Sequence, residues 1–168
     1  MQNLNKDQVL KIMENYGNDP QQLIAVLLDI QAASGKNYVE KQWAQLASQV
    51  LDVPLSKIYD VLTFYAMFST TERGEFIVEI CQSTSCHFCN ADKIAAWFEA
   101  ATGLKPGQTS ADGKITIARS SCFGACDIGP AVKIGDNVFG NLTKEKVLLL
   151  VKYCREGNTE GLESICQN

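Results

Sequence analysis

The placement of cysteine constrains this chain more than any other sequence feature. The 168 residues include 7 cysteines, and none of them lies in the first 80 positions. An odd number of cysteines, in a chain without an export-like start, argues against a disulfide scaffold. In a reducing compartment, clustered cysteines are more often metal ligands or redox groups. The cysteines are Cys81, Cys86, Cys89, Cys122, Cys126, Cys154 and Cys166.

Charge and hydropathy exclude several other classes of protein. The net charge is −4 and the sequence pI is about 5.0, which disfavours a broad basic surface for nucleic acid or anionic lipid. The longest apolar runs, residues 23–28 and 147–151, are far too short to span a bilayer. The first residues, MQNLNKDQVL, contain no basic segment followed by an apolar one, as a signal peptide would. We therefore expect a cytoplasmic protein.

Residues 1–70 are predicted to form a small helical bundle. Apolar residues recur at helical spacing in four short segments, and Asn5 followed by Gln8 is typical of a capping box. Pro20 favours a second helix start directly after the first helix. The polar stretch 70–74 is predicted to be a linker to the rest of the chain.

Residues 75–157 are predicted to form an α/β domain with a mixed sheet. Strand-like and helix-like patterns alternate there in the order β-α-β-β-β-α. The residues after Gly157 are expected to be a loose tail, residues 158–168. The predicted strands are 76–80, 114–118, 131–134 and 137–139, and the predicted helices are 92–102 and 143–153.

Two pairs of cysteines follow the first two predicted strands. Cys81 and Cys86 come after the first strand, and Cys122 and Cys126 come after the second. If those strands are parallel neighbours, their following loops lie at the same edge of the sheet. The four thiolates can then converge on one site.

Four thiolates suit either zinc or an iron–sulfur cluster. Structural zinc sites usually have tighter ligand spacing than the gaps of four and three residues found here. These gaps favour a [2Fe–2S] cluster, with one cysteine pair for each iron. A Rieske centre needs two histidines, and the chain contains only His87.

The sequence resembles the thioredoxin-like [2Fe–2S] ferredoxin family in its second half. The whole chain resembles the small iron–sulfur subunits of NADH:quinone oxidoreductase and of NAD-linked hydrogenases, electron-bifurcating complexes and formate dehydrogenases. Two matches lie near the cysteines: the C-x4-C and C-x3-C pattern, and the Gly129-Pro130 pair. Two more are the TFYxxF segment at 63–68 and the T-x-DG-like turn at 109–113.

The resemblance implies an electron-relay subunit that holds one [2Fe–2S] cluster through Cys81, Cys86, Cys122 and Cys126. It further implies a larger flavoprotein partner that binds FMN and NAD(P)(H), and possibly a further iron–sulfur or hydrogenase subunit. The chain itself contains no GxGxxG fingerprint and no P-loop. The bundle is expected to supply the docking surface.

Among such complexes, the resemblance favours a soluble or electron-bifurcating hydrogenase or transhydrogenase. Residues 87–90 depart from the arginine-glycine stretch of the commonest respiratory form. A respiratory NADH:quinone oxidoreductase or formate dehydrogenase subunit is the alternative. Other classes also stay open: a free-standing ferredoxin, a zinc-stabilised interaction module, and a disulfide oxidoreductase that uses Cys86 and Cys89.

Several residues allow a structural interpretation beside a functional one. Cys89, Cys154 and Cys166 are expected to be spare thiols, and His87 to face solvent or bond locally. Residues 63–65 are either bundle core or an interface element. The Gly129–Pro130 bond is expected to be trans, as most X–Pro bonds are, with cis as the alternative beside the cysteines.

Overall fold

The chain divides into two compact units, residues 1–73 and 74–168. The computed structural model describes the backbone of residues 4–166 and the side chains of residues 4–162. Among these residues, no helix is both long enough and apolar enough to cross a membrane.

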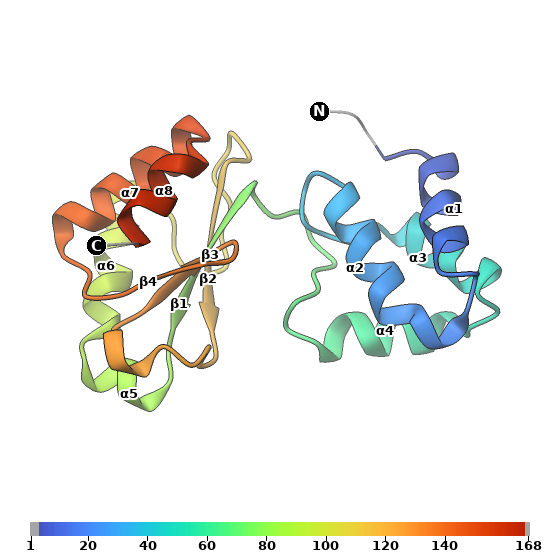
Figure 1. Cartoon of the computed structure of the whole chain (residues 1–168), viewed down its shortest axis with the longest axis horizontal. Helices are drawn as coiled ribbons and strands as arrows, with labels where there is room; N and C mark the ends of the chain where they lie inside the picture. Colours follow the sequence, from blue (N-terminus) through green and yellow to red (C-terminus); the bar gives the residue numbers. More distant parts are fainter. Residues whose placement is uncertain (1–3, 167–168) are drawn as a thin grey trace. The chain divides into compact units, whose positions relative to one another are not determined.

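The first unit is a bundle of short helices (Figure 1). Asn5 and Gln8 form the expected capping box, which satisfies two of the free N–H groups at the start of α1. Pro20 starts a 3₁₀ turn, η1, and not an α-helix directly. The elements are α1 (Lys6–Asn15), η1 (Pro20–Gln22), α2 (Leu23–Ala33), α3 (Lys41–Val50) and α4 (Leu55–Phe64).

The second unit contains a four-stranded mixed sheet with the order β2-β1-β3-β4. Strands β1 (Phe76–Cys81) and β2 (Ile115–Ser120) are parallel, as expected. Strand β3 (Val132–Ile134) is antiparallel to both β1 and β4 (Asn137–Phe139). The sheet is therefore mixed, with the central β1 paired on both sides.

Helices α6 (Ala91–Thr102) and α7 (Lys144–Glu156) are packed together beside this sheet (Figure 1). Phe98 of α6 and Leu150 of α7 join Val78 of β1 in one apolar core. Both helices end at a glycine in the left-handed conformation, a common way for a helix to end.

The expectation of a loose tail after Gly157 is wrong for most of that segment. Residues Thr159–Cys166 form helix α8, and Leu162 is buried in the core of the second unit. Asn158 accepts a hydrogen bond from the Gly161 N–H at 2.9 Å, near the start of this helix. Short helices in proteins are stabilised mainly by tertiary packing, and Leu162 supplies such a contact for α8.

Two short helical elements lie in the cysteine loops. Helix α5 (Thr84–Phe88) follows β1, and a 3₁₀ turn, η2 (Cys126–Ile128), follows β2. Neither was predicted, since elements of five and three residues have too few positions to show a period. The Gly129–Pro130 bond directly after η2 is cis, the alternative to the expected trans form.

Candidate metal centre

The parallel pairing of β1 and β2 brings the two cysteine loops to the same edge of the sheet. Cys81 is the last residue of β1 and Ser120 is its register partner at the end of β2. The backbone pairing continues for one more residue, because the Gln82 N–H donates to the Ser120 carbonyl oxygen at 3.0 Å. Both loops therefore leave the sheet side by side.

The first pair of cysteines is buried. Cys81 and Cys86 are each 1% exposed, and both lie in a small cluster with Ala91 and Ala131. Helix α5 holds Cys86 there, with the His87 N–H donating to the Ser83 carbonyl oxygen at 2.9 Å. Burial is the largest cause that raises the pKa of the Cys86 thiol above its ordinary value.

The second pair of cysteines is exposed and close together. The Sγ atoms of Cys122 and Cys126 are 3.4 Å apart. The Gly124 N–H donates to Cys122 Sγ at 3.4 Å, and this bond is the largest cause that lowers the pKa of Cys122. The Cys122 side chain in turn raises the pKa of Cys126. Cys122 is therefore favoured to ionise before Cys126.

The two pairs are also near enough to affect each other's ionisation. The Cys81 side chain affects the pKa of both Cys86 and Cys122, and the charge of Cys126 affects the pKa of Cys86. Gly129, which follows η2, lies so close to the first pair that a Cβ there would be 3.5 Å from Cys86 Sγ. The four sulfurs thus meet in one loop cluster.

This donor set fits a dinuclear iron–sulfur cluster. Within the part of the chain that the structure describes, no group of three or more His, Cys, Asp or Glu side chains is already arranged to hold a metal ion. Two pairs of cysteine thiols, one buried and one exposed, are a donor set that suits a cluster of two irons. The small residues of the loops allow backbone N–H groups such as that of Gly124 to approach the sulfurs.

Cys89, Cys154 and His87 lie outside this cluster of sulfurs. Cys89 is an exposed free thiol, and Cys154 is buried in the core of the second unit, which confirms the structural interpretation of Cys154. The side chain of Cys166 lies outside the described residues. His87 is mostly exposed, with its Nδ1 3.4 Å from Asp92 Oδ2, as expected for a locally bonded histidine.

Exposed aromatic residues are the feature that sequence reasoning left undecided. Phe64 is 80% exposed, so the core interpretation of residues 63–65 is wrong for this side chain. Phe68 is the buried residue of the segment. Tyr65 and Met67 are also partly exposed, and Phe88 is 81% exposed next to the first cysteine pair. An aromatic at the end of a short helix gives no sequence signal that separates core from surface.

Sequence analysis also did not identify Arg119, a charged residue near the cysteines. Arg119 of β2 and Gln82 after β1 line a cavity beside the loop cluster. Sequence reasoning could have located Arg119 here only through the assumed parallel pairing of the two strands. That pairing places residue 119 beside residue 80 once the register is known.

Comparisons with known proteins show which proteins this chain is similar to. The model of the thioredoxin-like [2Fe–2S] ferredoxin family matches residues 9–155. The chain is 29% identical to the HndA subunit of an NADP-reducing hydrogenase from Solidesulfovibrio fructosivorans, over 87% of this chain and 85% of that protein. It is 32% identical to a subunit of an NADH-quinone oxidoreductase from Rhizobium meliloti, over 64% of each protein.

The fold also resembles a solved NAD⁺-reducing [NiFe]-hydrogenase in the air-oxidised state. The TM-score is 0.68 at 19% identity, over 80% of this chain and 23% of that chain. This chain therefore spans about a quarter of that hydrogenase chain. Because the family model covers most of the sequence, including all four cysteines of the loop cluster, the chain belongs to the thioredoxin-like [2Fe–2S] ferredoxin family.

Proposed function

We propose that this chain is an electron-transfer subunit of a multi-subunit, NAD(P)(H)-linked oxidoreductase. In this proposal Cys81, Cys86, Cys122 and Cys126 hold one [2Fe–2S] cluster, which when bound accepts and donates a single electron. The observation that carries the proposal is the meeting of two cysteine pairs at the ends of two parallel strands.

The chain's own residues have distinct tasks in this role. Cys81 and Cys86 supply thiolates from a buried wall that excludes water. Cys122 and Cys126 supply thiolates on the exposed side, where a redox partner can approach. The Gly124 N–H stabilises negative charge on the Cys122 sulfur. No side chain of this site needs to act as an acid, base or nucleophile.

The proposed partner is a flavoprotein subunit that binds FMN and NAD(P)(H). The names of the similar proteins, which are subunits of NADH-quinone oxidoreductases and of an NADP-reducing hydrogenase, support a complex of this kind. The exposed Phe64, Tyr65 and Met67 support a docking role for the helical bundle. We call Phe64, Tyr65 and Met67 together the aromatic patch, after its two aromatic residues.

Among such complexes we favour a soluble or electron-bifurcating hydrogenase or transhydrogenase in the cytoplasm. The match to the hydrogenase subunit over 87% of this chain supports this choice. A respiratory NADH:quinone oxidoreductase or a formate dehydrogenase is the alternative. Co-purification of the native complex, followed by assays for H₂, formate and quinone, separates these possibilities.

The test of the cluster is spectroscopic. We expect the anaerobically purified chain to be red-brown, to contain two irons and two sulfides, and to give an S = 1/2 EPR signal after reduction with dithionite. Substitution C126S should reduce the iron content, whereas C89S, at an exposed thiol three residues from Cys86, should not. A colourless protein with stoichiometric zinc would contradict the proposal and favour an interaction module.

A further inference from the structure

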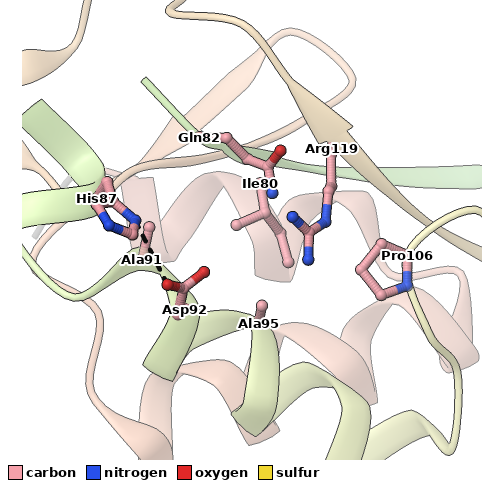
Figure 2. A pocket seen from close by; sticks show the side chains of 8 residues that line it. All are labelled: Ile80, Gln82, His87, Ala91, Asp92, Ala95, Pro106 and Arg119. Atoms are coloured by element: carbon pink, nitrogen blue, oxygen red, sulfur yellow. Dashed lines mark ion pairs between the residues drawn. The ribbon is translucent and has the colours of Figure 1, made fainter. Parts of the chain in front are cut away.

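A cavity of about 300 Å³ opens between α6 and the ends of β1 and β2, and no step of the proposed electron transfer uses it. Ile80, Ala91 and Ala95 supply apolar wall, and Ile80 and Ala91 are buried. Figure 2 shows the polar side chains of the cavity at two separated places around this wall. The cavity therefore combines an apolar floor with a few solvent-exposed polar side chains.

Arg119 provides the positive end of the cavity. It is the register partner of Ile80, and its guanidinium extends over Ile80 into the cavity (Figure 2). With the Gln82 amide turned so that its oxygen faces Arg119, this oxygen accepts from Nε at 2.8 Å and from Nη1. Among the described residues, no carboxylate forms an ion pair with Arg119.

The hydrogen bonds to Gln82 leave donors of Arg119 open to the cavity. A guanidinium has five N–H groups, and the Gln82 oxygen uses two of them. The same orientation of the Gln82 amide directs its NH₂ group away from Arg119 and leaves that group able to donate. The positive end of the cavity thus offers several donors and one positive charge.

Asp92 provides the negative end of the cavity. Its Oδ2 is 3.4 Å from Nδ1 of His87, and the pair lies across the cavity from Arg119 (Figure 2). A carboxylate at this end disfavours any ligand with a second negative charge. The cavity is therefore suited to one negative charge at Arg119 and unsuited to a dianion such as phosphate.

We propose that this cavity binds a single carboxylate group at Arg119. The planar guanidinium matches a carboxylate in two parallel hydrogen bonds, and a ligand can reach it because the Arg119 side chain is exposed. The carboxylate belongs either to a free monocarboxylic acid or to an Asp or Glu side chain of a docked protein. The proposal goes beyond electron transfer and does not depend on it.

Ligand-observed NMR titration of the full-length protein, purified with its cluster, tests the proposal. The probes are acetate, for a free acid, and N-acetyl-glutamate α-amide, for a protein side chain, at constant ionic strength. We expect saturable binding of at least one probe that is at least tenfold weaker in R119Q. R119K, which keeps the charge and loses the planar fork, should fall between R119Q and the unaltered protein.

Two further variants serve as controls. K105Q removes an exposed positive charge next to Pro106, one of the residues at the edge of the cavity, and should bind both probes as before. D92N removes the opposing carboxylate and should bind them at least threefold more tightly. Thermal unfolding of each variant verifies that it is folded, and phosphate should not displace the bound probe.

Tighter binding of the blocked glutamate than of acetate would assign the cavity to an acidic side chain of a partner, and the reverse order would assign it to a free acid. Failure of both probes to bind saturably, or equal binding by R119Q and the unaltered protein, would overturn the proposal. Iron content and EPR are recorded on the same samples, so a missing cluster is recognised separately from missing carboxylate binding.

Discussion

Cys122 and Cys126 face solvent, whereas Cys81 and Cys86 are buried, and this difference gives the two pairs different chemistry. Burial raises the pKa of Cys86 and so disfavours its thiolate, which a bound metal would stabilise. A backbone N–H lowers the pKa of Cys122 and prepares it as a thiolate. At the residue scale, Cys122 is therefore the cysteine best prepared to bind a metal first.

Gly124 allows a test of that backbone contact. Its φ is +91°, a conformation that costs a residue with a side chain about 1–3 kcal/mol. We expect G124A to weaken the N–H bond to Cys122 Sγ and to lower the midpoint potential of the cluster, because hydrogen bonds to sulfur favour the reduced form. Potentiometric titration followed by EPR measures this change.

G113A is the matched control for G124A. Gly113 has φ +68° in the turn before β2, away from the cysteine loops. It should lose comparable stability without a change in potential. An equal potential in G124A and the unaltered protein would remove the role given to the Gly124 N–H.

Because Cys154 is buried, we expect the free energy of unfolding to depend on pH. Burial raises its pKa to about 12, whereas an unfolded thiol ionises near pH 8.5. Its contribution to the free energy of unfolding is therefore complete below about pH 8.5 and is lost as the pH rises toward 12. The loss amounts to about 1.4 kcal/mol per pH unit within that window.

We expect the stability of C154A to decline less between pH 9 and 10.5 than that of the unaltered protein. Urea unfolding under reducing conditions at several pH values measures this difference. At pH 7 the variant should be less stable, since truncation leaves a small cavity in the core. Parallel pH profiles of the two proteins would contradict the pKa assigned to Cys154.

At the scale of elements, strand and helix patterns predicted the sheet well and the site loops poorly. Strands β1 and β2 are rich in apolar and β-branched residues, so their positions agree with the structure to within two residues. Helix α5 and turn η2 are too short for any periodicity. Their conformation depends on the packing of the loops against Ala91, Ala131 and each other.

Gly140, directly after β4, packs closely against Ile128 of the second cysteine loop. A Cβ at this position would overlap the carbonyl oxygen and side chain of Ile128, with Cγ1 at 2.6 Å. The next residue, Asn141, donates its N–H to the same carbonyl oxygen at 2.9 Å. We expect G140A to destabilise the protein by about 1–3 kcal/mol and to reduce iron content, because η2 must shift.

Iron analysis and urea unfolding measure the effect of G140A. G129A is a milder substitution for comparison. A Cβ at this position would lie 3.3 Å from the Cys126 carbonyl oxygen, a less severe contact. G129A should therefore have the smaller effect on stability. Normal iron content in G140A would show that η2 is not held by this contact.

At the scale of the whole molecule, the two compact units have separate roles in the proposed function. The second unit contains all four proposed ligands, and the first contains the aromatic patch next to a surface cavity of about 580 Å³. Exposed aromatic residues of this kind often dominate the binding energy of an interface. The proposed function therefore places metal binding and docking on different units.

Substitution F64A tests the docking role. Phe64 is 80% exposed, so we expect the variant to keep its stability and visible spectrum. Its affinity for the co-purified flavoprotein subunit should fall at least tenfold, measured by surface plasmon resonance. L148A, at an exposed leucine of α7, is the control and should bind normally. Equal affinity in F64A would transfer the docking role to another surface.

The sequence by itself determined the positions of the strands, the helix caps and the spacing of the cysteines. These depend on local rules: side-chain period, capping hydrogen bonds and the covalent distance along the chain. The expected convergence of Cys81, Cys86, Cys122 and Cys126 needed one further assumption, the parallel pairing of β1 and β2. The structure supplied that pairing.

Only the tertiary structure decided which groups are buried and which are open. Burial depends on neighbours that are distant in sequence, so no local pattern could show that Phe64 is exposed or that Leu162 docks α8 into the core. The position of Arg119 across from Asp92 likewise required strand register and helix packing together. The cavity they line therefore exists only at the level of the folded unit.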